Sequence, residues 1–453
     1  MPPYLLAARL IAVLAGAASV GATPVNSNST ISSDLSGRDS MIATAELPAP
    51  GSKYRLVSEQ QATAAPGTCS QDITLINECA GGSRGECQGT VTAYIYGLVS
   101  VHAGWTFMRP DSQFFPLGAE VQEVPQDQVA IRIPEGGRVD IRLPDCMSSG
   151  RIVSVANGDA LHFSGSKGEV RAPSEVNPSE PSHDSFWSFM ELTLDPNDGL
   201  TVNPSQVDSA GIPVAVELEH FDGDRDPVVT GGMKADAVAT ICEKLATQAL
   251  ADGQPWDKLC HRSNTTGAYV RASSPMMYIN GGNPTAFQDY YEPYIDQVWE
   301  QYRNQDLVFD VGSSGNHTFR VGPDDQLRSV NSTVSFSKPC TRDIFTCATG
   351  PFTENGDPFH NQIVARLCAA FVRSTIHTGH VQPSDALPHK RYYQGNPSNH
   401  YAKFVHEVSK NGKGYAFPVD WVDGPSVADK DMPHGQITIK NPGRLTVTIG
   451  GWR

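Results

Sequence analysis

The sequence is short of positive charge. Its 34 lysines and arginines stand against 49 aspartates and glutamates, which gives a formal net charge of −15 at pH 7. Proteins that hold nucleic acid through a charged face present a basic surface, so this composition argues against a nucleic-acid partner. An acidic surface is compatible with a neutral polymer and repels an acidic one.

Long apolar runs are missing beyond the N-terminus. The one near the start, Leu5–Val20, is interrupted by Arg9 and leads into the small residues Gly21 and Ala22. This pattern is typical of a secretory signal peptide, predicted here over residues 1–22, rather than of a membrane anchor. No later run approaches the ~20 apolar residues of a spanning helix, so we expect no membrane partner. The predicted location is extracellular or in a cell wall.

Motifs for metals, nucleotides and cofactors are missing as well. Without a Cys-x-x-Cys pair or a His-Glu-x-x-His helix, His400 and His406 are interpreted as structural or groove-lining rather than as metal ligands. Gly412-Lys413-Gly414 lacks the rest of a phosphate-binding loop. Residues 81–85 match the hydrolase pattern Gly-x-Ser-x-Gly, but they lie in a glycine-rich loop between two cysteines. We therefore expect neither a metal nor a cofactor.

The chain has nine cysteines, and secretion would place most of them in disulfides. Neighbours in the sequence suggest three pairs, although proximity alone does not fix connectivity: Cys79–Cys87, Cys242–Cys260 and Cys340–Cys347. The odd count leaves at least one thiol unpaired. Cys368, on an apolar helical face, is the candidate for a buried free thiol.

Secretion would also make the N-glycosylation motifs usable. Four Asn-x-Ser/Thr motifs are present, each predicted to lie in a surface loop: Asn28, Asn264, Asn316 and Asn331.

Glycine and proline are plentiful, with 41 and 33 residues, which favours β structure with many turns. Residues 23–70 are rich in Ser, Thr, Ala and Pro and are predicted to form a flexible leader. Beyond residue 72, apolar and polar residues alternate in short segments separated by turns, as in a sandwich or barrel. These segments are 91–96, 129–133, 139–143 and 214–218.

Helical periodicity begins after residue 230. Three apolar stripes are predicted, within residues 236–253, 291–302 and 363–372. Tyr291, Trp299 and Tyr302 could form a sugar platform, but at helical spacing the core is the favoured interpretation. Alternation returns at 414–417 and 445–449. We therefore predict a β domain of residues 71–228 and 415–453, a mixed α/β domain of residues 229–414, and a groove where they meet.

Two carboxylates stand out in the β region. Glu191 and Asp208 lie on neighbouring strand-like segments, and the hairpin signal Asp198-Gly199 between them reverses the chain. A turn centred there opposes Glu191 to Gln206 and makes Asp208 its diagonal neighbour, at roughly 7–8 Å. Inverting glycosidases hold their acid and base roughly 6.5–9.5 Å apart, with room for one water. The alternative is that both are solvated acids on a sheet.

Several segments around this pair resemble glycoside hydrolase family 64, the thaumatin-like β-1,3-glucanases. The resemblance spans residues 72–451. Its motifs are Phe189-Met-Glu-Leu-Thr-Leu194, Gln206-Val-Asp-Ser-Ala-Gly-Ile-Pro213, Arg271-Ala-Ser-Ser-Pro275, Tyr294-Ile-Asp-Gln-Val-Trp299, Arg391-Tyr-Tyr393, the run 399–407 and the run 414–420.

The resemblance implies an inverting endo-β-1,3-glucanase, cutting laminarin or cell-wall glucan to short oligosaccharides. It also implies a mainly β fold with an α/β part: a thaumatin-like barrel or sandwich beside a mixed α/β domain, flanking a wide groove. Carried over, Glu191 is the general acid and Asp208 the general base. The predicted substrate contacts are Trp187, Thr193, Asp195, Ser205, Gln206 and Asp420; Asp195 stands where the family pattern has Asn. We expect the protein to act as a monomer.

Two other functions fit the same sequence. One is a catalytically silent glucan-binding or defence protein on this fold, since a fold does not dictate a function. The other is a structural wall protein whose acids only keep it soluble. The presence of both carboxylates favours the enzyme, because a protein that only binds glucan does not need them.

Overall fold

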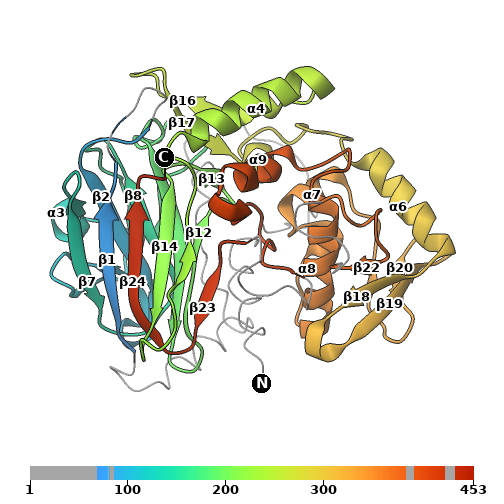
Figure 1. The fold of residues 1–453 in the computed structure, drawn as a ribbon, viewed down its shortest axis with the longest axis horizontal. Helices are drawn as coiled ribbons and strands as arrows, with labels where there is room; N and C mark the ends of the chain where they lie inside the picture. The colour runs from blue at the N-terminus through green and yellow to red at the C-terminus, as the bar shows by residue number, and fades with distance from the viewer. Residues whose placement is uncertain (1–68, 80, 82–85, 384–391, 424–433, 453) are drawn as a thin grey trace, which may run out of the picture.

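The computed structural model describes residues 69–79, 81, 86–383, 392–423 and 434–452 (Figure 1). The predicted signal peptide, nearly all of the predicted leader, the motif at Asn28 and most of the loop 81–85 lie outside these residues. Within them, no helix combines the length and the apolar character that crossing a membrane requires.

One five-stranded sheet brings together segments from both ends of the described chain. Its strands, in order, are β15 (Val228–Thr230), β14 (Val214–His220), β24 (Pro442–Ile449), β1 (Gln71–Asn77) and β7 (Arg138–Leu143). The alternation of β14 buries Val214, Val216 and Leu218. β1 pairs in parallel with β24, which places the blue and red strands side by side in Figure 1.

The second large sheet has eight strands. Seven lie in the order β23 (Ile437–Ile439), β12 (Gly199–Ser205), β11 (Trp187–Asp195), β8 (Met147–Val155), β2 (Val91–Val99), β3 (Gly104–Met108) and β4 (Phe114–Pro116), and β6 (Ile131–Ile133) also pairs with β2. One face carries Ile95, Ile152, Met190 and Val202, which share a single hydrophobic core with Leu75 and Val447 of the five-stranded sheet. Alternating strands thus build a two-sheet core.

The opposite face of the eight-stranded sheet changes character along its length. At one end Tyr94, Val153 and Phe189 lie side by side in register and belong to a second apolar cluster. Residues around a small sheet cover that cluster, among them Val124, Phe163 and Val170. The covering elements are β5 (Gln122–Glu123), α3 (Gln126–Val129), β9 (Ser164–Ser166) and β10 (Glu169–Arg171). At the other end the same face is polar, and the candidate site lies there.

Helices, a five-stranded sheet and two strands of a three-stranded sheet lie between residues 229 and 414 (Figure 1). The helices are α4 (Ala237–Asp252), α5 (Pro275–Asn280), α6 (Glu292–Asn304), α7 (Thr341–Thr346), α8 (Pro358–Val372) and α9 (His400–Val408), with short 3-10 turns at Trp256–Leu259, Gly312–Ser314, Gly350–Phe352 and Lys410–Gly412. A three-stranded sheet joins β13 (Ser209–Ala210), β17 (Tyr269–Ser273) and β16 (Cys260–Arg262); a five-stranded one joins β21 (Ser335–Phe336), β20 (Leu327–Ser329), β19 (Asn316–Val321), β18 (Leu307–Asp310) and β22 (Val381–Gln382).

The three predicted apolar stripes are found in α4, α6 and α8. Gly253 ends α4 in the left-handed conformation, as its position after the stripe predicted. Tyr291, Trp299 and Tyr302 are all buried, which confirms the core interpretation over the sugar platform.

Two of the three suggested disulfides are present, Cys79–Cys87 and Cys242–Cys260. The third suggestion, Cys340–Cys347, is wrong: these residues flank α7, and seven residues of helical rise separate them by about 10 Å, beyond the ~7 Å that a disulfide tolerates. Cys347 instead bonds Cys368, so the expectation of a free Cys368 is also wrong. The fourth disulfide is Cys69–Cys146, and among the described residues Cys340 carries the free thiol.

The C-terminal segment lies with the β part through two strands. β23 pairs with β12, and β24 lies between β14 and β1. Between α9 and β23, however, Arg373 at the end of α8 donates hydrogen bonds to the backbone carbonyl and the carboxylate of Asp420. The boundaries of the two predicted domains stay a prediction, as does the groove between them.

Candidate active site

The hairpin β11–β12 presents Glu191, with a register that differs from the predicted one. Glu191 is opposite Asn203, and Asp195 is opposite Gly199. The predicted pairing of Glu191 with Gln206 is therefore wrong by three residues. The physical reason is Asp195: its carboxylate accepts the backbone N–H groups of Asn197 and Asp198, at 2.8 and 3.2 Å, and closes the turn early. The structure thus gives Asp195 a turn-closing role, and its substrate contact stays a prediction.

A row of polar side chains crosses four adjacent strands. Tyr96 on β2 is opposite Arg151 on β8, Arg151 is opposite Glu191 on β11, and Glu191 is opposite Asn203 on β12. Residues directly opposite one another share a face of the sheet. Arg151 Nη2 lies 3.7 Å from Glu191 Oε1, and the Glu191 side chain is 14% exposed. The row continues the face that carries Phe189 and Trp187 and faces away from the two-sheet core.

Asp208 follows β12 and immediately precedes β13. Its carbonyl accepts the backbone N–H of Ser274 at 2.8 Å, which fixes the turn. Burial raises the pKa of Asp208, and the Arg151 guanidinium opposes that rise. Burial also raises the pKa of Glu191, again against Arg151, and the Asp208 charge adds to the rise. The structure therefore brings the two carboxyl groups into electrostatic contact around one guanidinium.

A third carboxyl group, Glu175, adjoins this pair. Its side chain is 6% exposed and accepts a hydrogen bond from the Ser209 hydroxyl, 2.9 Å from Oε1. Burial, followed by the nearby charge of Asp208, raises the pKa of Glu175 to about 8. Sequence reasoning missed Glu175, because it lies in a loop with no periodic pattern. Arg151 and Asn203 were missed because only the strand register reveals them.

Several buried polar atoms on this face have no hydrogen-bond partner among the described residues. They are Trp187 Nε1, Thr193 Oγ1, Asn203 Oδ1 and Ser205 Oγ. Ser205 is opposite Phe189, and Thr193 is opposite Thr201, whose hydroxyl lies 3.0 Å from that of Thr438 on β23. Most buried polar groups in folded proteins are paired, so unpaired ones beside a carboxyl pair are candidates for ligand contacts. Trp187, Thr193 and Ser205 were predicted as such from the sequence.

The side chains of Gln206 and Asp420 form hydrogen bonds within the protein. The Gln206 side-chain Oε1 accepts the N–H of Tyr415 at 3.1 Å, and its carbonyl accepts the hydroxyl of Tyr401 at 2.6 Å. Asp420 is fully buried, and both of its carboxylate oxygens are bonded within the protein. For Asp420 this replaces the expected substrate contact, because no carboxylate oxygen faces outward.

The two histidines of α9 lie in different surroundings. The ring of His400 packs edge-on against Trp256, and His406 contacts Asp420. Within the described ranges, no three His, Cys, Asp or Glu side chains form a group that could hold a metal ion.

Residues 71–449 match glycoside hydrolase family 64, described as β-1,3-glucanase. A glucan endo-1,3-beta-glucosidase of Cellulosimicrobium cellulans is 30% identical over 367 residues, and one of Arthrobacter sp. (strain YCWD3) is 29% identical over the same length. Each match covers 79% of this chain and 62% of the relative, so the chain spans less than two thirds of these curated proteins.

Solved structures share the fold. The crystal structure of a laminaripentaose-producing β-1,3-glucanase in complex with laminaritetraose has a TM-score of 0.70 and 24% identity, over 85% of this chain and 99% of that one. A family 64 β-1,3-glucanase domain from Clostridium beijerinckii has a TM-score of 0.62 and 18% identity, over 86% and 100%. The mainly β architecture with helices is thus one that these proteins have in common; the thaumatin-like description stays a prediction.

Proposed function

Because the chain belongs to glycoside hydrolase family 64, we propose that it is an endo-β-1,3-glucanase that hydrolyses β-1,3-glucan with inversion of configuration. The observation that carries the proposal is the pairing of Glu191 and Asp208 around Arg151, on a sheet face with unpaired buried hydroxyls. Hydrolysis of a glycosidic bond needs one carboxyl group that gives a proton and another that takes one.

Glu191 is the general acid in this proposal. A general acid must keep its proton until the bond to the leaving sugar breaks, and a raised pKa serves that purpose. Burial and the neighbouring Asp208 charge both raise the pKa of Glu191. The Arg151 guanidinium limits the rise, so Glu191 remains acidic enough to donate its proton.

Asp208 is the general base, taking a proton from the attacking water. It needs to be ionised while Glu191 is protonated. Glu175 helps here, because with a pKa of about 8 it stays neutral at mildly acidic and neutral pH. A neutral neighbour puts no second negative charge beside Asp208, whereas Arg151 favours its ionised form.

A neutral, hydroxyl-rich polymer suits the surrounding residues. Thr193, Ser205 and Asn203 offer buried oxygen atoms with no protein partner in the described part of the chain, and Trp187 offers an N–H donor. Sugar hydroxyls both donate and accept hydrogen bonds, so they can satisfy each of these groups. The net charge of −15 would not impede an uncharged glucan.

We also propose that the protein is secreted, glycosylated and monomeric, and that it acts outside the cell or in a cell wall. Four disulfides support an oxidising compartment. Asn264, Asn316 and Asn331 are exposed, as glycan attachment requires.

The test is the stereochemistry of hydrolysis. Laminarin is digested in an NMR tube, and the anomeric signals of the first product are recorded within minutes. Inversion gives the α-anomer first. The β-anomer would mean retention, with Asp208 as a nucleophile ~5–5.5 Å from Glu191, and would overturn the proposed mechanism.

A variant of the base gives an independent test. Asp208→Asn should abolish hydrolysis, and added azide should partly restore it by replacing the activated water. A wild-type protein that binds laminarin but releases no reducing sugar would instead favour the silent glucan-binding protein.

A further inference from the structure

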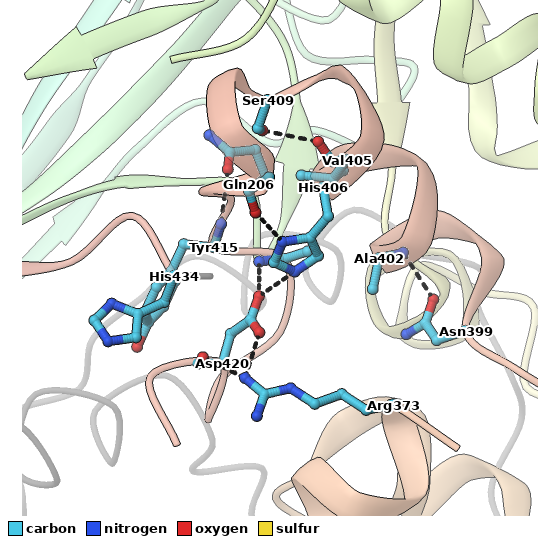
Figure 2. A network of polar contacts seen from close by, with 12 residues as sticks. Gln206, Arg373, Asn399, Ala402, Val405, His406, Ser409, Tyr415, Asp420 and His434 are labelled. Carbon is cyan, nitrogen blue, oxygen red and sulfur yellow. Dashed lines mark hydrogen bonds and ion pairs between the residues drawn. The ribbon is translucent and has the colours of Figure 1, made fainter. Parts of the chain in front are cut away.

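His406, on α9, has both ring nitrogens bonded to acceptors. Nδ1 lies 2.8 Å from the carbonyl oxygen of Gly412, and Nε2 lies 2.9 Å from Asp420 Oδ2 (Figure 2). A carbonyl oxygen and a carboxylate oxygen can only accept, so both nitrogens must donate. Only the protonated imidazolium has two N–H donors. The geometry therefore calls for a charged His406.

Besides His406, Asp420 accepts hydrogen bonds from two other parts of the chain. Arg373 donates to Oδ1 at 2.9 Å, and the backbone N–H of Ala416 donates to Oδ2 at 2.8 Å. Burial pushes the pKa of Asp420 upward, but His406 and Arg373 outweigh it and hold the pKa below its ordinary value. One buried carboxylate thus joins α9, the end of α8 and the backbone at Ala416.

The backbone segment at Ala416 also contacts the strand end that precedes Asp208. Tyr415, next to Ala416, exchanges two hydrogen bonds with Gln206: its N–H donates to Oε1 at 3.1 Å, and its carbonyl accepts the Gln206 N–H at 2.9 Å (Figure 2). Tyr401, also on α9, donates to the Gln206 carbonyl. Gln206 precedes Asp208 by two residues. The position of Asp208 is therefore tied to the contacts of Asp420.

We propose that His406 is a positioning residue, whose imidazolium fixes Asp420 and, through Tyr415 and Gln206, the segment that carries Asp208. The inference rests on the proposed function in taking Asp208 as the general base. Loss of the His406 proton removes one of its two donors and turns a lone pair toward an oxygen atom. The link to Gln206 then loosens, and the base is less well placed to activate water.

The expected pH dependence follows from the groups that face His406. Burial lowers its pKa, but Asp420 and the Gly412 carbonyl outweigh burial and the repulsion from Arg373, so the net pKa is raised. A raised pKa means that the contacts are fully formed below about 6.5, the ordinary value for histidine, and are lost as the pH rises through the higher folded value.

Three further titratable side chains surround these contacts. The Tyr393 ring lies 5.6 Å from that of His406, and His434 Nε2 lies 3.3 Å from Asp423 Oδ2. Burial raises the pKa of Asp423 to about 7 and lowers that of His434 to about 4. Asp423 therefore titrates near neutral pH and needs its own control.

The experiment compares wild type with His406→Gln on laminarin between pH 5 and 9. Glutamine cannot take up the proton, so the wild-type to variant ratio of kcat should be largest below pH 6.5, on the order of 10²-fold at most. It should fall toward one as the pH passes the folded pKa of His406. KM should change less than kcat, because the proposed contacts of Trp187, Thr193 and Ser205 with the sugar do not involve His406. A ratio that does not vary with pH overturns the inference.

Two variants serve as controls. His400→Gln lies on the same helix, against Trp256, and should give a ratio that is flat with pH. With Asp423→Asn introduced into both proteins, the ratio of kcat without and with His406→Gln should still vary with pH. If Asp423→Asn removes that dependence, Asp423 rather than His406 is the titrating group, and the inference is wrong.

A readout without catalysis separates this inference from the proposed function. Amide hydrogen exchange of residues 206–210 and 415–420, corrected for the intrinsic effect of pH, should quicken in wild type as His406 loses its proton. His406→Gln should show the fast exchange at every pH. Unchanged exchange overturns the inference even if laminarin is cut, whereas pH-linked exchange in a protein that leaves laminarin intact supports it and refutes the proposed function.

Discussion

Two groups of buried ionisable side chains differ in how many donors surround their carboxyl groups. The first, called the acid cluster, comprises Glu175, Glu191 and Asp208; the second, the Asp420 network, comprises Asp420, Arg373 and His406. Burial raises the pKa of every carboxyl group in the acid cluster. It acts in the same direction on Asp420, yet the pKa of Asp420 is lowered.

The donors explain the difference. Asp420 accepts from Arg373, His406 and the backbone of Ala416. Glu191, by contrast, has the Arg151 guanidinium at 3.7 Å, beyond hydrogen-bond distance, and one side-chain hydrogen bond from Asn203. Glu175 accepts from one hydroxyl. A buried carboxyl group that is well supplied with donors stays ionised and holds structure together. One with few donors has a raised pKa, which suits a group that gives or takes a proton.

The contrast between the acid cluster and the Asp420 network fails if the acid cluster is not needed for turnover. Glu191→Gln keeps the shape of the side chain but removes the proton, so we expect turnover on laminarin to fall by roughly 10²–10⁴, the usual contribution of a placed acid. Binding of laminarin should survive. Glu217→Gln, on β14 of the other large sheet, is the matched control and should keep normal turnover. Near-normal turnover of Glu191→Gln would show that the cluster is not catalytic.

The second test removes the negative charge of Asp420 from the Asp420 network. Asp420→Asn leaves two buried cations without their carboxylate, and breaking a buried pair in this way costs about 3–5 kcal/mol of unfolding free energy. Urea unfolding at pH 6 measures it. Glu175→Gln is the control, because replacing a carboxyl group that is already neutral should cost far less. Equal losses in the two variants would contradict the distinction between the clusters.

Arg151 provides a further test, since its guanidinium opposes the rise in the pKa of both Glu191 and Asp208. Without it the pKa values of Glu191 and Asp208 should both rise. The pH–rate profile of Arg151→Gln should therefore move to higher pH on both limbs, with a smaller loss at the optimum than in Glu191→Gln. Arg151→Lys keeps the charge and should keep most of the profile. A profile of Arg151→Gln that moves to lower pH would exclude this role.

The smallest effect is expected from Glu175→Gln, and its sign depends on pH. The folded pKa of about 8 exceeds the ordinary value of 4.5, so between these limits the folded protein holds a proton that the unfolded chain has released. Wild-type stability should therefore decrease as the pH rises through this window, and a glutamine avoids that loss. The melting temperature of Glu175→Gln minus that of wild type should increase by a few degrees from pH 5 to pH 8. A constant difference would show that Glu175 is ionised throughout.

Local patterns allowed much of the architecture to be predicted from the sequence. The alternation of β14 and the stripe of α6 appear where they were expected, because side-chain periodicity follows directly from the geometry of a strand or helix. The predicted register of the hairpin β11–β12 was wrong by three residues. The Asp198-Gly199 signal was sound in that Gly199 has a positive φ of 78°. The carboxylate of Asp195, however, starts the turn earlier, which a two-residue motif does not reveal.

The electrostatic surroundings of the site could not be predicted in the same way. Arg151 and Glu175 reach Glu191 and Asp208 from other strands and loops, and no local pattern marks a residue that matters only through a distant neighbour. Asp420 was expected to contact the substrate from the family resemblance, and charged residues are seldom fully buried. It is buried because Arg373 and His406, from two different helices, accompany it.

The strand order of the five-stranded sheet has a consequence for biosynthesis. β24, the last strand in the described residues, lies between β14 and β1 rather than at an edge. The Gln71 side chain donates a hydrogen bond to the carbonyl of Gly443, 372 residues further along. A ribosome delivers β1 long before its partner, so the nascent sheet has two open edges at its centre while the helical part is still being made. Such distant pairing slows folding. A cell that makes this protein must therefore keep the growing chain from pairing with others until β24 emerges.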